Sequence, residues 1–132
     1  MELNILRADP AGNITVFVLD PVEKAQRAAI AEKIMAIPAL KAEQVGYACT
    51  AEDDVDGHME MMGGEFCGNA TRAYGMYIAQ QKGGLSSVRL RVSGCDHVVT
   101  AQVDLKSGTA RAEMPCPRSV KRVTVNGHEG TL

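Results

Sequence analysis

A cysteine at the entrance of a predicted helix is the residue best suited to chemistry in this chain. In the stretch GGEFCGNATRAYGMYIA, Cys67 comes directly before an amphipathic segment. The first N–H groups of a helix lack partners within it and carry partial positive charge, which favours a thiolate there. A partly ionised thiol suits a group that must act as a base in one step and as an acid in another.

The two residues that follow Cys67 add a binding feature. Gly68 lets a ligand approach the backbone closely, and Gly68 and Asn69 offer successive N–H groups that can hold a carboxylate. A thiol beside such a cradle would face the α-carbon of a bound amino acid. The alternative is a glycine-rich helix entrance with a buried cysteine. Arg72 opposes the helix dipole, and either a functional role or an ion pair with an acidic residue such as Glu65 would account for it.

Other patterns of reactive residues are weaker. The chain has four cysteines and no C-x-x-C pair, and its three histidines do not supply metal-ligand spacing, so we predict free thiols and no metal site. Outside Cys67, small buried or half-buried roles are expected for Cys49, Cys95 and Cys116. The acidic run with Asp53, Asp54 and Asp56 lacks the spacing of a calcium loop and predicts a solvated turn.

Composition narrows the class of protein. With 132 residues the chain is the size of one domain, and its 16 acidic and 14 basic residues leave a net charge of −2. No large field of one sign invites nucleic acid or an anionic membrane surface. Because neither a long apolar run nor the pattern of a secretory signal is present, we expect a soluble, cytoplasmic protein.

The elements that must position Cys67 follow from local patterns. Residues 3–8 and 13–19 predict a β-hairpin, and Asp20-Pro21 predicts a helix start, with Asp20 as cap and Glu23 closing a capping box. This helix should run to about Met35. Its predicted buried face comprises Val22, Ala25, Ala29, Ile30, Ile34 and Ile37.

Further strands are predicted at residues 43–49 and 58–62, followed by a helix from Gly68 that ends at Gly83-Gly84. Residues 87–92, 96–105 and 109–115 predict an antiparallel meander, and residues 117–132 begin another strand-like run. The order β-β-α-β-β-α-β-β-β has too few βαβ units for a doubly wound sheet. We therefore predict an α+β fold, with a mainly antiparallel sheet curled around the helix after Cys67.

Several of these segments together carry a family resemblance. GEFCGNATRAY, with AGNITVFV before it and VRLRVSGC after it, resembles the N-terminal half of the diaminopimelate epimerase superfamily from about Leu3 to Pro117. Within the superfamily, AEQVGY, GGEFCGNAT, VSGC and AEMP look more like the histidine racemases of opine-type metallophore biosynthesis. MMGGEF departs from the longer, asparagine-bearing stretch of the diaminopimelate enzymes.

The resemblance implies a two-lobed isomerase, a racemase or epimerase that needs no pyridoxal phosphate or other cofactor. Two cysteines would work on opposite faces of an amino acid, and Cys67 matches the one from the N-terminal lobe. Gly68 and Asn69 match the carboxylate-binding backbone, and Asn13 matches a side chain that lines the pocket. Glu43 and Glu65 are candidates to contact a polar or cationic substrate side chain, although a strand-edge charge would also account for Glu43.

On this resemblance, residues 3–117 form the N-terminal lobe and residues 118–132 begin the connection to a second lobe absent from this chain. Alone, the chain should have little or no activity, and two copies could pair through the face that the second lobe would cover. Diaminopimelate epimerase and a non-catalytic amino-acid-binding module remain alternative functions. A thiol-based redox or metal protein is a further alternative.

Overall fold

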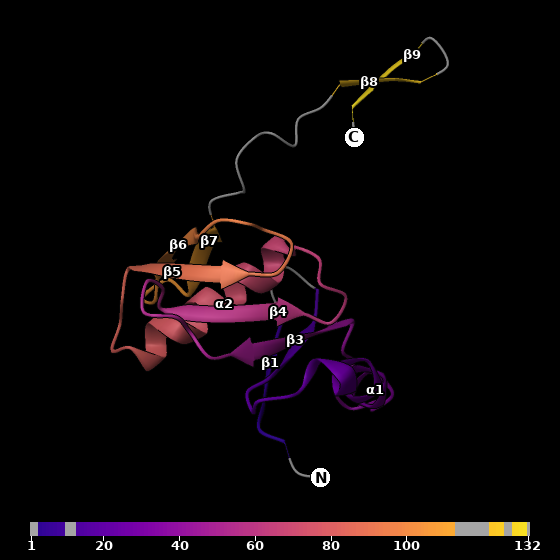
Figure 1. Ribbon diagram of the computed structural model, residues 1–132. Coiled ribbons are helices and arrows are strands. Elements are labelled where there is room, and N and C mark those ends of the chain that lie inside the picture. Colours follow the sequence, from indigo (N-terminus) through magenta and orange to yellow (C-terminus); the bar gives the residue numbers. More distant parts are fainter. Residues whose placement is uncertain (1–2, 10–12, 113–121, 126–127, 132) are drawn as a thin grey trace.

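The computed structural model describes residues 3–9, 13–112, 122–125 and 128–131. Figure 1 shows its elements, which follow the predicted order from β1 to β7 and end in a further pair of strands. They are β1 (Ile5–Ala8), β2 (Thr15–Val18), α1 (Lys24–Met35), β3 (Gln44–Cys49), β4 (Gly57–Met61), α2 (Gly68–Gln81), β5 (Ser87–Val92), β6 (Val99–Asp104), β7 (Thr109–Ala112), β8 (Arg122–Val125) and β9 (His128–Thr131).

Strands β1 to β7 form one sheet in chain order, and β8 and β9 pair separately as an antiparallel hairpin. Within the large sheet, β2–β3 and β4–β5 are parallel, and the other four neighbouring pairs are antiparallel. The two parallel pairs are the ones whose connections contain α1 and α2, as parallel strands require a crossover. The predicted α+β fold, a mainly antiparallel sheet curled around a helix, is confirmed.

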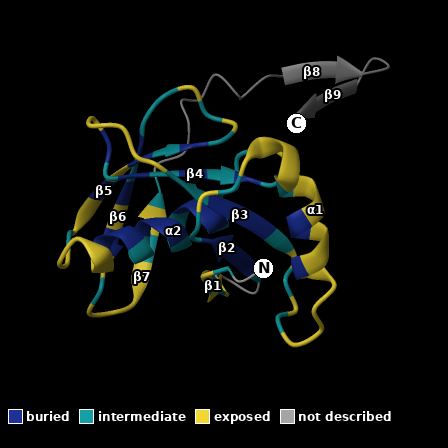
Figure 2. Ribbon diagram, turned by 60° about the horizontal axis from the view of Figure 1, so that its bottom comes forward, coloured by how far each residue is buried: buried dark blue, intermediate teal, exposed yellow. Residues whose placement is uncertain are grey.

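The sheet has a different helix on each face. Along β2, Phe17 belongs to a cluster around α2, whereas Val16 and Val18 belong to a cluster with α1. This division follows from the alternation of side chains along a strand. Because both faces are covered, all four residues of β2 are buried, as Figure 2 shows in dark blue.

Helix α2 lies deep in the concave side of the sheet. Tyr74 and Ile78 are buried there, and a Cβ atom at Gly75 would come within 2.8 Å of the Cβ of Ala101 on β6. The helix therefore needs a residue without a side chain where it crosses β6. It ends as predicted at Gly83 and Gly84, which have φ angles of 87° and 101°.

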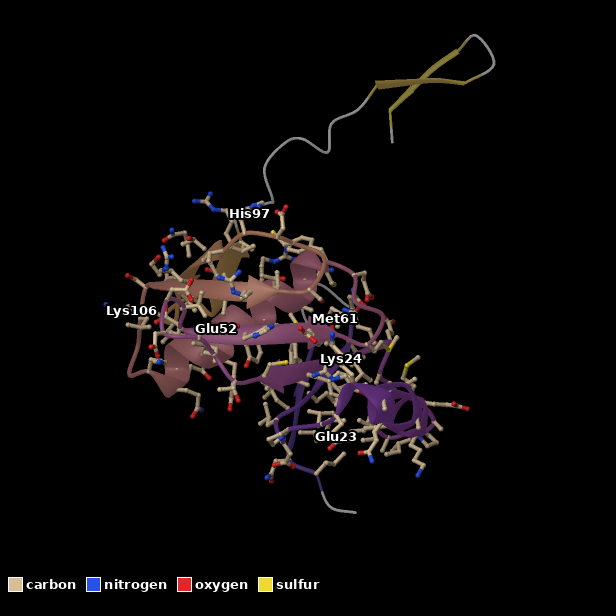
Figure 3. The ribbon with its side chains drawn as sticks, in the orientation of Figure 1. Glu23, Lys24, Glu52, Met61, His97 and Lys106 are labelled. Atoms are coloured by element: carbon tan, nitrogen blue, oxygen red, sulfur yellow. The ribbon has the colours of Figure 1, made fainter. Side chains whose placement is uncertain are left out.

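The start of α1 differs from the prediction. The helix begins at Lys24, and Glu23 at the N-cap makes no side-chain capping bond (labelled in Figure 3). Asp20 instead accepts hydrogen bonds from the backbone N–H (2.6 Å) and the side-chain amide (3.2 Å) of Asn4. The predicted capping box is wrong because the carboxylate of Asp20 ties the end of β2 to the segment before β1.

The buried face of α1 is also narrower than predicted. Ile30, Ala31 and Ile34 are buried, whereas Ala25, Ala29 and Ile37 are exposed. Figure 2 shows the outward side of α1 exposed in yellow, because the helix rests on the sheet along one side only. Neither helix in the described ranges has the length and hydropathy needed to span a lipid bilayer.

Candidate functional site

Cys67 is the N-cap of α2, as the sequence predicts. Its sulfur accepts a hydrogen bond from the N–H of Ala70 at 3.5 Å. Its carbonyl accepts from the N–H of Thr71 at 2.9 Å and from the Thr71 hydroxyl at 2.8 Å. The Thr71 side chain is fully buried, so a buried hydrogen bond holds the backbone of Cys67 at the helix start.

Strands β2 and β3 bring two further side chains to the sulfur. Thr15 and Gln44 are register partners in the parallel pair, and the Gln44 amide donates to the Thr15 hydroxyl at 2.8 Å. The same nitrogen, Nε2, lies 3.2 Å from the sulfur of Cys67. An amide N–H aimed at a sulfur stabilises its thiolate form.

Sequence reasoning did not single out Thr15 or Gln44. The only local signal is a pair of polar residues at the first positions of two otherwise apolar strands. Their contact depends on the parallel pairing of β2 with β3, which is not encoded locally.

The predicted binding residue Asn13 lies at the same end of the sheet. It is half-buried, and its carbonyl accepts a hydrogen bond from the Thr15 hydroxyl at 3.3 Å. A chain of contacts therefore runs from Asn13 through Thr15 and Gln44 to Cys67. The structure thus brings together two candidates that are 54 residues apart in the sequence.

Gly68 and Asn69 form the first turn of α2 and are half-buried. The hydrogen bonds among the described residues leave the backbone N–H groups of both residues available at the helix start. Arg72 donates to the side-chain oxygen of Asn69. Arg72 is thus held by its own helix and makes no ion pair with Glu65 within the described residues.

The two acidic candidates lie at the edge of this site. Glu43 is exposed next to Gln44, and its backbone N–H donates to the carbonyl of Ile14 at 2.9 Å. Glu65 is exposed as well, and its carboxylate accepts from the N–H of Gly63 at 3.1 Å. Gln44 contacts the sulfur of Cys67. Glu43 directly precedes Gln44, and Glu65 lies two residues before Cys67.

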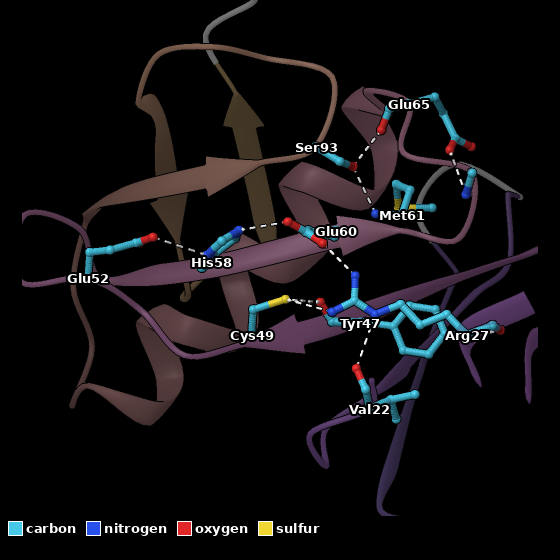
Figure 4. Close-up of polar contacts among 11 residues, drawn as sticks. Val22, Arg27, Tyr47, Cys49, Glu52, His58, Glu60, Met61, Glu65 and Ser93 are labelled. Atoms are coloured by element: carbon cyan, nitrogen blue, oxygen red, sulfur yellow. Dashed lines mark hydrogen bonds and ion pairs between the residues drawn. The ribbon is translucent and has the colours of Figure 1, made fainter. Parts of the chain in front are cut away.

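The loop that leads into Cys67 is braced by the turn after β5. The Ser93 hydroxyl donates to the carbonyl of Glu65 at 2.6 Å and accepts from the N–H of Met61 at 2.8 Å, as Figure 4 shows. One hydroxyl therefore joins the end of β4 to the residue two positions before Cys67. Thus the Ser93 turn, which belongs to the predicted meander, supports the site.

The other cysteines within the described residues match their expected roles. Cys49 and Cys95 are half-buried free thiols, and Cys95 contacts the carbonyl of His97 at 3.3 Å. Cys116 lies outside the described residues. Cys67 is half-buried too, and it differs from the other two by its position at a helix N-terminus.

Comparison with known proteins shows the family to which the chain belongs. Residues 2–132 match a family model described as the histidine racemase CntK N-terminal domain. The chain belongs to this family. One curated relative is the histidine racemase of Staphylococcus aureus (strain Mu50). It is 32% identical over 122 residues, which cover 89% of this chain and 44% of the relative.

A second relative is the histidine racemase of Fusobacterium nucleatum subsp. nucleatum. It is 42% identical over 79 residues, which cover 58% of this chain and 27% of the relative. The chain thus spans less than half the length of these curated relatives. Membership of the family of histidine racemase N-terminal domains agrees with the predicted resemblance.

Proposed function

We propose that this chain is the N-terminal lobe of a cofactor-independent histidine racemase in which Cys67 exchanges a proton with the substrate's α-carbon. The observation that carries the proposal is the environment of the sulfur. It lies at the N-cap of α2, 3.2 Å from the Gln44 amide, in a chain of the histidine racemase N-terminal domain family. The sulfur thus accepts hydrogen bonds from Ala70 and Gln44, and the residue is half-buried, not enclosed.

In this proposal the start of α2 binds the amino acid. The N–H groups of Gly68 and Asn69 hold the substrate carboxylate at the positive end of the helix dipole. Asn13 is half-buried at the same end of the sheet and contributes to binding the substrate there. Glu43 and Glu65 are exposed beside it and supply acceptors for the N–H groups of an imidazole side chain.

The reaction itself requires two thiols. The Cys67 thiolate takes the α-proton and becomes a thiol, and the electron pair of the C–H bond stays on the substrate as a carbanion that extends into the carboxylate. N–H groups at the helix start stabilise this charge. A thiol on the opposite face then protonates the carbon and becomes a thiolate, so the configuration inverts. We assign that second thiol to a further lobe, with residues 3–117 as the first lobe and residues 118–132 as the start of the connection.

The test uses the full-length protein with L-histidine in deuterated water. Loss of the α-proton signal by NMR and formation of D-histidine report the two halves of the reaction. Cys67→Ser keeps the shape of the side chain but is a much weaker base at neutral pH, so both rates should fall by about 10²- to 10⁴-fold. Cys95→Ser replaces another half-buried cysteine and should keep both rates.

Two results would contradict the proposal. Full turnover by Cys67→Ala would remove Cys67 from the chemistry, and histidine binding without exchange in the unaltered protein would favour a non-catalytic binding module. Diaminopimelate belongs in the same assay. Exchange of its α-proton in preference to that of histidine would make the protein a diaminopimelate epimerase.

A further inference from the structure

A second group of reactive side chains lies on the outer face of the β3–β4 hairpin. Cys49 and His58 are direct register partners across the hairpin, and Glu60 follows His58 by two residues, so it shares the same face. One ligand atom from each of the three residues lies within 4.8 Å of the others. Figure 4 shows them converging.

The imidazole of His58 has a carboxylate beside each of its two nitrogens. Nδ1 lies 3.5 Å from a carboxylate oxygen of Glu52, and Nε2 lies 3.3 Å from a carboxylate oxygen of Glu60. If Nδ1 carries the proton toward Glu52, then the lone pair of Nε2 faces the Glu60 carboxylate. In that tautomer a metal ion can lie between the Nε2 lone pair and the carboxylate.

Metal-binding histidines commonly have a carboxylate near the ring nitrogen that does not bind the ion, and His58 has one. A carboxylate on the far nitrogen fixes the tautomer and the orientation of the ring that binds the ion. Glu52 is in that position, and Glu52 is half-exposed in the turn that connects the two strands. The acidic turn thus supplies one outer carboxylate to the group.

The donor set indicates the kind of ion. A thiolate, an imidazole and a carboxylate together suit zinc and similar divalent transition metals, and three protein ligands leave a fourth position open. In such a site, ligand atoms lie roughly 3.3 to 3.7 Å apart, so the group must contract by only about 1 Å. The side chains of His58 and Glu60 keep 17% and 25% of their surface exposed, which leaves a path for the ion.

The guanidinium of Arg27, from α1, contacts two of the three residues. It donates to Glu60, and its Nη2 lies 3.7 Å from the sulfur of Cys49. The Tyr47 ring lies 5.3 Å below the guanidinium, and Nε donates to the carbonyl of Val22 at 3.2 Å. A metal ion must therefore compete with a well-positioned positive charge.

We propose that Cys49, His58 and Glu60 form a binding site for a divalent transition-metal ion such as Zn²⁺, with Glu52 behind His58 and Arg27 as an internal competitor. On binding, the Cys49 thiol releases its proton to solvent, and thiolate and carboxylate together neutralise the ion. The site is separate from Cys67. Gln44 and Cys49 stand at opposite ends of β3, about 17 Å apart along the strand.

The experiment is a titration of the protein with Co²⁺, with all cysteines in the thiol state and no histidine added. Binding is measured by the thiolate-to-cobalt charge-transfer absorption, and Zn²⁺ is then added as a competitor. Cys49→Ser should remove the charge-transfer band, and Glu60→Gln should weaken binding by at least about tenfold. Glu52→Gln should weaken binding by about 10- to 100-fold, through the orientation of His58. Arg27→Gln should tighten it by at least about tenfold, because a repelling charge is removed.

Cys95→Ser is the matched control and should leave the band unchanged. A band that survives in Cys49→Ser, or no band at a large molar excess of Co²⁺, would overturn the proposal. Circular dichroism of each variant checks that it folds, and Glu60→Gln carries the test if Cys49→Ser does not. Because racemisation is not measured, the outcome is independent of the proposed function.

Discussion

Cys67 has two hydrogen-bond donors of different origin. The N–H of Ala70 belongs to the first turn of α2, so any N-cap cysteine would receive it. The amide of Gln44 comes from the sheet and is specific to this fold. Gln44 therefore makes a contact with the sulfur that a substitution can remove without disturbing the helix.

We expect Gln44→Leu to slow α-proton exchange in the full-length protein. A hydrogen bond to a charged group contributes about 1.5 to 3 kcal/mol, and a tenfold change in rate corresponds to about 1.4 kcal/mol, so the rate should fall by about 10- to 100-fold. Gln102→Leu is the matched control, because Gln102 is an exposed strand glutamine on β6. Unchanged turnover in Gln44→Leu would show that the amide does not act on the sulfur.

The pair formed by Arg27 and Glu60 makes the stability of the lobe depend on pH. The hydrogen bond from Arg27 holds the pKa of the Glu60 carboxyl below its ordinary value of 4.5, and His58 and Lys24 also favour the charged form. A lowered pKa in the folded state means that the unfolded chain binds more protons in acid. The stabilisation is therefore complete above about pH 4.5 and is lost as the pH falls through the lower folded value.

Arg27→Met should consequently destabilise the lobe at pH 7 by about 1 to 3 kcal/mol and by less at pH 3. Urea unfolding at a series of pH values measures this difference. Lys33→Met is a suitable control, because Lys33 is an exposed cation on the same helix. A loss of stability in Arg27→Met that is equal at both pH values would point to lost packing over Tyr47 instead.

At the scale of elements, the turn after β5 and the loop before α2 are in close contact. Gly94 has a φ of 75°, and a Cβ atom there would come within 2.3 Å of the backbone nitrogen of Phe66. Phe66 precedes Cys67 directly. The backbone of the turn thus packs against the helix entrance without an intervening side chain.

Gly94→Ala should therefore disturb both stability and site. The left-handed φ and the overlap with the Phe66 backbone together should cost about 2 to 5 kcal/mol, and the helix entrance should shift. Gly108→Ala is the matched control, because Gly108 has a φ of 72° but no atom within 4 Å of the added Cβ. It should cost only about 1 to 2 kcal/mol and should not change how fast Cys67 is alkylated.

Thermal unfolding and mass-spectrometric mapping of alkylated cysteines measure both effects. Equal losses of stability in the two variants would show that the contact between Gly94 and Phe66 is not a constraint. An unchanged alkylation rate of Cys67 in Gly94→Ala would separate the turn from the site.

At the scale of the whole molecule, the described sheet and α2 carry one thiol at a helix entrance. Inversion at a carbon needs a base on one face and an acid on the other, and the chain spans 44% of the length of its relative from Staphylococcus aureus. We expect the 132-residue chain to fold but to show little or no D/L interconversion of histidine. Turnover resembling that of a full-length racemase would contradict this expectation.

Local sequence patterns determined most of the elements and the place of the thiol. The β-branched run of β2, the alternation of β4 to β7, the apolar stripe of α2 and its glycine stop are short-range features. The order of elements and the N-cap position of Cys67 could therefore be predicted. The capping box at Asp20 was wrong, because Asn4 is a long-range partner that no local pattern records.

Only the tertiary structure decided which residues meet. Gln44 reaches Cys67 because β2 and β3 pair in parallel, and Cys49 reaches His58 and Glu60 because β3 and β4 pair in one particular register. Metal-ligand motifs that can be recognised in a sequence have their ligands close together along the chain. Ligands on paired strands are instead placed by register, which depends on the burial of both faces of the sheet and not on neighbouring residues.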